Sequence, residues 1–329
     1  MDPALLMERL RVCLAPDHTV ERLLGSGGMG AVFLGRDVAL DRPIAIKVLQ
    51  PEMFTAALAA RFLREAQLLA KLAPHPHIVS IHKAEPKQGL FYYTMDYLGE
   101  ETLAAHLERG RFSPERALRL GLDLLGGLAA AHRIEVVHRD IKPSNIFLLE
   151  GRALIADFGI AHSPRKAAET ELTIPGQPIG TMRYMSPEQA LGQPADPRSD
   201  LYSTGVVLYE ALTGRHWPPL QPPKHGDWSG VPRGLARVLQ RALEPAPDHR
   251  WATAAAFGTA LQALTRRRTA RLQALGISIV VAVVAASIFR PSGPPSFCRR
   301  PSASDLAFLP FTASGEVPGV GGRDFAQMV

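Results

Sequence analysis

Three glycines are the first residues whose spacing suggests chemistry. The stretch Gly25-Ser-Gly27-Gly-Met-Gly30-Ala-Val32 has the form G-x-G-x-x-G-x-V. The same glycines open dinucleotide-binding folds, but those folds need a helix directly after the last glycine. Here the following residues, Ala-Val-Phe-Leu-Gly, read as a strand. This context favours a hairpin whose backbone N–H groups close over phosphates.

A cation follows the glycines after a short interval. Lys47 lies within the apolar strand predicted over 43–50, where an unpaired ammonium group would be costly to bury. Glu65, in a helix predicted over 56–72, is the natural partner for that charge. Taken alone, Glu65 is better explained as part of an ordinary solvated helix face.

Two further motifs complete the set: His138-Arg139-Asp140-Ile-Lys142-Pro-Ser-Asn145 and Asp157-Phe158-Gly159. With them the chain resembles the eukaryotic-type (Hanks-type) protein kinases, and the bacterial transmembrane serine/threonine kinases in particular. The resemblance covers residues 18–265, with the motifs in the family's order. It implies an ATP-dependent serine/threonine protein kinase, for which phosphoryl transfer depends mainly on positioning and charge neutralisation.

The resemblance implies a site for ATP and for Mg²⁺ (or Mn²⁺). The residues that it assigns to ATP are Gly25, Gly27, Gly30, Val32, Ala45, Lys47, Met95, Asp96, Leu98 and Phe147. The glycines are expected to cover the triphosphate, and the backbone of 96–98 to form the hinge beside the adenine. Asn145 and Asp157 are expected to ligate the metal, a hard cation that prefers oxygen ligands.

The resemblance also implies the catalytic roles. Lys47 is expected to hold the α and β oxygens of ATP while it pairs with Glu65. Asp140 is expected to accept or orient the proton of the substrate hydroxyl, and Lys142 to steady the γ-phosphate. Thr181 is expected to bond both of these residues and to favour serine or threonine acceptors.

Other matches imply architecture and regulation. We expect Glu188 to pair with Arg250, Asp200 to brace the catalytic loop, and His138 to be structural rather than catalytic. In the family, an arginine directly before the catalytic aspartate goes with a loop that is ordered by phosphorylation, because a phosphate neutralises the arginine.

Arg139 occupies that place. Thr173 is the expected autophosphorylation site and Thr170 the second choice. Ordinary polar loop residues are the alternative interpretation of both threonines.

The elements that must position these residues divide the chain into two lobes. We predict an α+β, bilobal kinase fold at 18–265, with a β-rich N-lobe at 18–98 and a helical C-lobe at 99–265. An N-terminal extension, 1–17, precedes it and contains a predicted helix over 1–15.

Within the C-lobe, helices are predicted over 113–133, 198–214, 233–243 and 252–264. The first begins with Ser113 as its cap and Pro114 at its first position. The proline-rich stretch 216–234 stands where relatives place a short helix that docks substrates, which leaves substrate docking open.

The C-terminal part differs in character. Residues 266–271 form a basic juxtamembrane segment, and 272–289 are uncharged. Eighteen residues span roughly 27 Å as a helix, against a hydrocarbon core of about 30 Å. We therefore predict one C-terminal transmembrane helix, with a buried core helix as the alternative. Residues 290–329 form a short tail rich in Pro, Gly and Ser, expected outside the cytoplasm.

Composition limits the remaining possibilities. The 329 residues carry a net charge of +6, most of it after residue 265, so the kinase region has no basic surplus that would suggest nucleic acid as a partner. Cys13 and Cys298 are too few and too far apart for a disulfide scaffold or a metal site. We read no signal peptide, and we expect the kinase domain on the cytoplasmic side of the plasma membrane.

Three hypotheses for the function are compared. The first is an active kinase with protein substrates, anchored in the lipid bilayer through 272–289. The second is a catalytically silent pseudokinase scaffold, which the presence of Lys47, Asp140, Asn145 and Asp157 disfavours. The third is a small-molecule phosphotransferase, which the peptide-binding sequence at 180–189 disfavours. Homodimers that phosphorylate in trans are expected on the resemblance alone.

Overall fold

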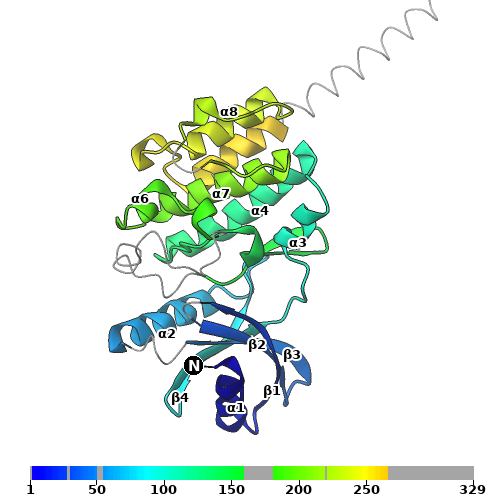
Figure 1. Cartoon of the computed structure of the whole chain (residues 1–329), viewed down its shortest axis with the longest axis vertical. Coiled ribbons are helices and arrows are strands. Elements are labelled where there is room, and N and C mark those ends of the chain that lie inside the picture. The colour runs from blue at the N-terminus through cyan, green and yellow to red at the C-terminus, as the bar shows by residue number, and fades with distance from the viewer. Residues whose placement is uncertain (1, 28–29, 50–54, 159–180, 219–220, 266–329) are drawn as a thin grey trace, which may run out of the picture. The chain divides into compact units, whose positions relative to one another are not determined.

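A β-rich lobe is followed by a helical lobe in the computed structural model, which describes residues 2–27, 30–49, 55–158, 181–218 and 221–265 (Figure 1). The bilobal α+β arrangement expected from the sequence is confirmed. Residues 266–329, which include the predicted transmembrane helix, lie outside the described residues. Among the helices that are described, none is long and apolar enough to cross a bilayer.

The N-lobe is built on a five-stranded antiparallel sheet with the order β1-β2-β3-β5-β4. Its strands are β1 (His18–Gly27), β2 (Gly30–Asp37), β3 (Arg42–Leu49), β4 (Ile81–Lys87) and β5 (Leu90–Asp96). The β-rich N-lobe predicted at 18–98 is confirmed, and the strands predicted after Gly30 and over 43–50 are β2 and β3. Gly25 pairs with Val32 and Gly27 with Gly30, so the glycines of the motif do form a hairpin rather than open a helix.

Alternation along β3 sends its side chains to two different environments. Ile44, Ile46 and Val48 belong to a core cluster with helix α1 (Pro3–Leu14), whereas Ala45 and Leu49 belong to the core beneath helix α2 (Ala56–Ala70). Because successive side chains of a strand point to opposite faces, Lys47 shares the second face. The strand thereby aims the side chain of Lys47 away from α1.

Helix α1 covers one face of the sheet and confirms the helix predicted over 1–15. Asp2 accepts a hydrogen bond from the backbone N–H of Ala4 (2.9 Å), and a proline follows at the first helical position. Leu6, Leu10 and Leu14 are buried against the sheet. The N-terminal extension is therefore an integral part of the N-lobe core.

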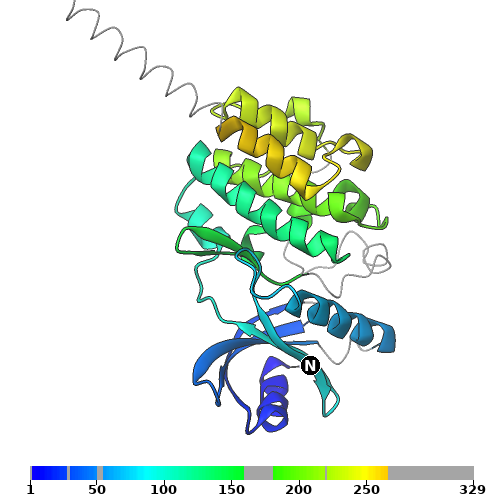
Figure 2. The same ribbon diagram turned by 180° about the vertical axis from the view of Figure 1, so that it is seen from behind.

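Helix α2 (Ala56–Ala70) lies across the other face of the sheet and contacts β4 and β5 (Figures 1 and 2). Thr55 caps it by accepting from the backbone N–H of Leu58 (3.2 Å). Its buried residues are spaced three and four apart: Ala59, Phe62, Ala66 and Leu69. Glu65 lies next to this buried stripe, at the margin of the helix that borders the C-lobe.

The C-lobe is organised around helix α7 (Pro197–Thr213), which is buried along nearly its whole length. Around it lie α3 (Leu103–Glu108), α4 (Pro114–Arg133), the short α6 (Pro187–Ala190), α8 (Arg233–Ala242) and a helix over 254–265. Ser113 caps α4 by accepting from the N–H of Arg116 (3.3 Å), as predicted. The sequence did not predict the hairpin of β6 (Ile146–Leu149) and β7 (Arg152–Ile155) or the helix α3.

Before α8 (Arg233–Ala242), the described residues of the proline-rich stretch form no α-helix, and they pack through aromatic rings. Trp217 and Trp228 both contact Tyr209 of α7 edge-on, with ring centroids 4.9 and 5.2 Å apart. A single 3₁₀ turn, η4 (Pro223–His225), lies between them. Two tryptophans thus supply the packing that a helix would otherwise give this part of the lobe.

Candidate active site

The catalytic loop brings three of the predicted residues into direct contact. Lys142 Nζ donates to Asp140 Oδ2 over 2.7 Å, and the side-chain amide of Asn145 donates to the same oxygen over 3.1 Å. The amide also donates to the backbone oxygen of Asp140 (2.8 Å). A 3₁₀ turn, η2 (Pro143–Asn145), returns the chain so that Asn145 reaches back to Asp140. The carboxylate is therefore held by two donors, with its charge balanced by one lysine.

A buried carboxylate fixes the backbone of this loop from below. Asp200, in the first turn of α7, accepts the backbone N–H of His138 (2.9 Å) and of Arg139 (2.8 Å) on its two oxygens. His132 Nε2 lies 2.8 Å from the same side chain. The predicted bracing role of Asp200 is confirmed, and His132 is a contributor that sequence reasoning missed.

His138 is structural, as predicted. Its Nδ1 accepts the backbone N–H of Asp140 (3.2 Å), so Nε2 must carry the proton and donate to the carbonyl of Ala156 (3.0 Å). Burial lowers the pKa of His138. The neutral ring therefore ties the loop that carries Asp140 to the strand that leads to Asp157.

Lys47 reaches the carboxylate of Asp157, with which it forms an ion pair. Asp157 has a φ of 58°, a left-handed conformation that is uncommon for a residue other than glycine. Such backbone strain is typical of functional sites. Burial lowers the pKa of Lys47, and the carboxylate of Asp140 opposes that shift.

The prediction of an ion pair between Lys47 and Glu65 is wrong: the structure pairs each of them with other residues. Glu65 Oε1 instead accepts from Arg61 Nε, one turn earlier on α2 (2.9 Å), and lies 3.5 Å from Arg139 Nη1. The physical reason is competition: two guanidinium groups face Glu65, while Asp157 already neutralises Lys47. Arg61 was missed, although its i, i+4 spacing to Glu65 is a readable signal.

A cleft of about 520 Å³ opens beside this pair. It lies between α2 and the segment 134–139 that follows α4. Its lining includes Arg61, Arg64 and Arg139 together with Glu65 and Glu135. Three guanidinium groups against two carboxylates give the cleft a positive surplus and make it suited to an anion.

The residues expected around adenine come together on neighbouring strands. Ala45 of β3 is paired with Met95 of β5, and both are buried. Val32 of β2 and Phe147 of β6 are partly buried against the same core cluster. A Cβ atom on Gly30 would lie 2.5 Å from the carbonyl oxygen of Val48, so only glycine fits this part of the hairpin.

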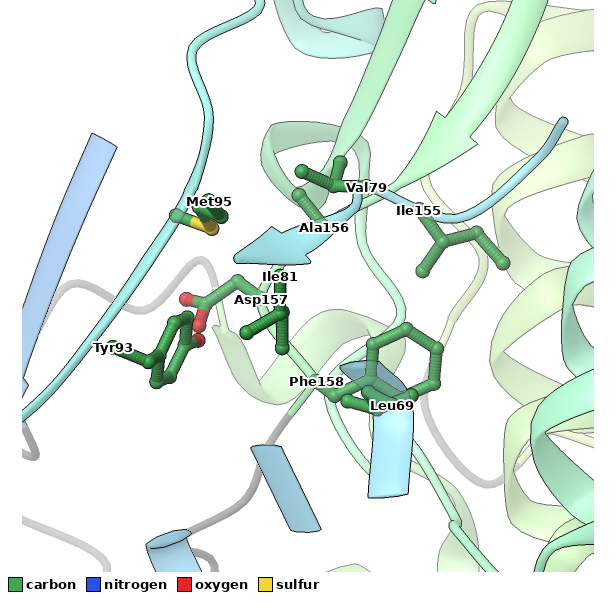
Figure 3. A pocket seen from close by; sticks show the side chains of 9 residues that line it. All are labelled: Leu69, Val79, Ile81, Tyr93, Met95, Ile155, Ala156, Asp157 and Phe158. Atoms are coloured by element: carbon green, nitrogen blue, oxygen red, sulfur yellow. The ribbon is translucent and has the colours of Figure 1, made fainter. Parts of the chain in front are cut away.

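Behind Met95, a small cavity separates the sheet from the Asp157 segment (Figure 3). Figure 3 shows the Asp157 carboxylate and the Phe158 ring pointing to opposite sides of their backbone. The Phe158 ring packs against His138, with centroids 4.5 Å apart. Packing of Phe158 thus helps to direct Asp157 toward Lys47.

The predicted hinge follows β5. The backbone N–H of Asp96 donates to Ser80 (3.1 Å), and its carboxylate lies 2.9 Å from His82 Nε2. The hydrogen bond from His82 lowers the pKa of Asp96. Leu98 lies beyond the end of the strand and packs at the edge of the core. Asp96 is thus anchored within the sheet, and the chain between it and Leu98 crosses to the C-lobe.

The donor set fits the divalent metal that the resemblance implies. The backbone N–H of Ala156 donates to the carbonyl of Asn145 (2.9 Å), which holds Asn145 beside Asp157. One amide and one carboxylate are oxygen donors of the kind Mg²⁺ takes, with phosphate and water completing its shell. Within the described ranges no group of three or more His, Cys, Asp or Glu gathers as a metal site.

The predicted pair of Glu188 and Arg250 is confirmed and is buried. Arg250 donates to both oxygens of Glu188, at 2.8 and 2.7 Å, and Ser199 donates to one of them at 2.6 Å. Burial alone would raise the pKa of Glu188, but these hydrogen bonds lower it to about 2. The pair ties α6 to the segment after α8.

The remaining predicted residues belong to the activation segment. Thr170 and Thr173 lie outside the described residues. Thr181 begins a 3₁₀ turn, η3 (Thr181–Tyr184), but the placement of its hydroxyl also lies outside what the structure describes. After that turn, Gln189 donates to the carbonyl of Arg139 (2.9 Å), a contact that ties α6 to the catalytic loop and that the sequence did not reveal.

The geometry agrees with the comparisons to known proteins. The family profile described as "Protein kinase domain" matches residues 18–258. Serine/threonine-protein kinase PrkC of Bacillus subtilis is 34% identical over 255 residues, covering 72% of this chain and 39% of PrkC. Serine/threonine-protein kinase PknB of Mycobacterium tuberculosis is 37% identical over 271 residues, covering 78% of this chain and 42% of PknB.

Among solved structures, the PknI kinase domain of Mycobacterium tuberculosis is similar, with a TM-score of 0.60 and 30% identity. The match covers 75% of this chain and 96% of that domain. The chain spans about two-fifths of the length of the curated relatives PrkC and PknB. The shared part is the two-lobed region.

Proposed function

Because this chain belongs to the protein kinase family, as a Hanks-type bacterial serine/threonine kinase, we propose that it transfers the γ-phosphate of ATP to serine and threonine hydroxyls of proteins. One observation carries the proposal. Asp140 is held by Lys142 and Asn145 at 2.7 and 3.1 Å, and its charge acts on Lys47, which pairs with Asp157. Two carboxylates, two lysines and an amide are the groups that phosphoryl transfer needs.

Each side chain has a distinct task in this proposal. ATP supplies the transferred phosphoryl group, and Mg²⁺ neutralises its charge. Asp140 orients the acceptor hydroxyl and takes its proton, while Lys142 balances negative charge beside it. Lys47 would hold phosphate oxygens, and Asp157 would ligate the metal together with Asn145. The pseudokinase alternative is not favoured, because no member of this set is missing.

The test is incorporation of labelled phosphate from γ-labelled ATP by the full chain with Mg²⁺. Label on serine and threonine is expected for the wild type and for a control variant, Asp248→Asn, which removes an exposed carboxylate. Asp140→Asn should lower turnover by on the order of 10²–10⁴ while ATP binding persists. An Asp140→Asn protein with wild-type turnover would remove Asp140 from its role. ATP binding without any label in the wild type would favour the scaffold.

Activation by phosphorylation of the activation segment is the next part of the proposal. It is supported by the arginine-lined cleft and by the engagement of Arg139 and Arg61 with Glu65. A phosphate of about −2 charge on Thr173, or on Thr170, would compete for these guanidinium groups. Glu65 would then be released toward Lys47. A phosphopeptide map without phosphate on either threonine would rule this out.

Membrane anchoring and pairing complete the proposal. The uncharged segment 272–289, after the basic segment 266–271, supports a single span with the kinase lobes in the cytoplasm. Deleting 266–329 should release an active enzyme from membranes; a truncated chain that unfolds would instead assign 272–289 to the core. Phosphorylation of an Asp140→Asn chain by a wild-type chain would establish that two copies act in trans.

A further inference from the structure

Helix α8 presents a row of exposed arginines. Arg233, Arg237 and Arg241 are spaced four residues apart, and all three are exposed. Because a helix turns once in about 3.6 residues, this spacing places them along one side. No acidic residue lies between 229 and 243, and none of the three takes part in an ion pair among the described residues. We call these residues the α8 arginine row.

The opposite side of α8 is part of the core. Leu235 and Leu239 are buried. The side chain of Leu264 packs against Gly234, because a Cβ atom added to that glycine would lie 3.0 Å from it. Figures 1 and 2 show α8 and the helix over 254–265 side by side, at the end of the C-lobe that is remote from the sheet. The row therefore borders the point where the described chain ends.

Arg241 is also held in place by an aromatic contact. Its guanidinium group lies 4.2 Å from the ring centroid of Trp251, and Trp251 stacks on Phe257 with centroids 5.9 Å apart. This packing fixes one member of the row on the rigid end of the lobe. The other two remain available to a partner with negative charge.

We infer that the α8 arginine row binds the anionic headgroups of the membrane to which the proposed anchor attaches the chain. This inference rests on the proposed transmembrane segment at 272–289. Only six residues, 266–271, lie between residues 265 and 272, and these seven steps along the chain span about 25 Å at full extension and about 10 Å as a helix. Since Leu264 contacts the first turn of α8, a bilayer-spanning anchor brings the row to the cytoplasmic surface.

Charge complementarity selects the lipid headgroup as the occupant. Cytoplasmic leaflets carry a negative surface potential that attracts basic segments, and each arginine near the surface strengthens association roughly five-fold. Guanidinium groups bind phosphate in bidentate fashion. Three arginines on one rigid helix would therefore raise the bound population by on the order of 100-fold over a neutral row. The effect falls with salt, because the Debye length is about 10 Å at 0.1 M.

The experiment uses the full chain in vesicles of phosphatidylcholine alone, or with one part in three of phosphatidylglycerol. The exchange rate of the backbone amide hydrogens of α8 reports whether the helix contacts the vesicle surface. We compare the wild type with Arg233→Gln/Arg237→Gln, which leaves the stacked Arg241 in place. The control variant, Arg22→Gln/Arg36→Gln/Lys83→Gln, removes three exposed cations of the N-lobe, each already paired with an acid.

The expected result is at least a ten-fold slowing of α8 exchange by phosphatidylglycerol, reversed by 0.5 M salt and lost in the α8 variant but not in the control. Equal exchange in both vesicle types would overturn the inference. So would protection of α8 by a soluble acidic peptide but not by the anionic vesicles.

Resistance to alkaline extraction tests the anchor separately. If the chain resists extraction but anionic lipid does not change exchange in α8, the membrane anchor is supported and lipid binding by the α8 arginine row is refuted. A chain that extraction releases, yet that floats with anionic vesicles only when Arg233 and Arg237 are present, supports the row and refutes the span.

Discussion

Arg139 and Glu65 are joined across the two lobes, with Arg139 Nη1 3.5 Å from Glu65 Oε1. Glu65 belongs to α2 of the N-lobe, and Arg139 directly precedes the catalytic Asp140. This contact occupies the Glu65 carboxylate, with which Lys47 was expected to form an ion pair. Any other anion that binds the guanidinium group of Arg139 would therefore compete with Glu65, and so would affect the position of α2.

We predict that Arg139→Gln makes activity less dependent on loop phosphorylation. The variant removes a competitor for Glu65, so the unphosphorylated enzyme should gain activity while the phosphorylated enzyme loses its anchor for the phosphate. The ratio of activities before and after phosphatase treatment should fall toward one. An unchanged ratio would mean that Arg139 does not read the phosphate.

Lys47→Met should abolish phosphate incorporation. The substitution keeps the length of the side chain but removes the ammonium group that neutralises Asp157 and that is expected to hold phosphate oxygens. Labelled ATP assays on this variant measure the loss, with Lys83→Met as the control because Lys83 is exposed on β4 of the same sheet. Incorporation at the wild-type level would show that another cation holds the phosphates.

Most of the helices and strands, and most of the side-chain pairs, could be predicted from the sequence. The reason differs from one feature to the next. Glu188–Arg250 could be predicted because the resemblance to the kinase family assigns both positions, and the structure shows that both partners are buried and that each needs the other. The hairpin of the glycine motif followed from the strand-like residues after Gly30, where the local pattern itself favours a strand.

The pairing of Glu65 could not be predicted in the same way. Three cations, Lys47, Arg61 and Arg139, come from separate segments and compete for one carboxylate. Which one binds depends on the position of α2 and on Asp157, and neither is encoded in a local pattern. The hairpin β6–β7 was missed because four-residue strands give too short a period to recognise.

Arg250→Met should destabilise the fold by about 3–5 kcal/mol, because it leaves the buried carboxylate of Glu188 without its partner. Arg250 is fully buried and also donates to the carbonyls of Glu244 and Pro245. Denaturant unfolding measures the effect. Arg152→Met, at an exposed position on β7, is the control and should change stability by less than about 0.5 kcal/mol.

Acid should destabilise the protein partly through Glu188. Its pKa in the folded chain is about 2, below the ordinary 4.5, so its contribution is complete above pH 4.5 and is lost as the pH falls from 4.5 through 2. We expect stability to decline over this window in the wild type and to decline less in Glu188→Gln. The unfolding free energy of both proteins at pH 6, 4 and 3 tests this. Parallel curves would contradict it.

Leu10→Ala should cost about 2–5 kcal/mol, because Leu10 is fully buried between α1 and the sheet. Val12→Ala, two residues further on the exposed side of the same helix, should cost far less. Thermal unfolding of the two variants gives the comparison. Similar losses would mean that α1 is held by its helical propensity rather than by packing on the sheet.

The family match begins at residue 18, yet the folding unit begins earlier. A protein cut at the family boundary would lose α1 and turn Phe33, Ile44 and Ile46 toward water. Several contiguous apolar side chains on an exposed sheet face favour aggregation. Recombinant fragments should therefore start before Pro3, and a tag placed at the N-terminus needs a spacer long enough to leave the Asp2 cap undisturbed.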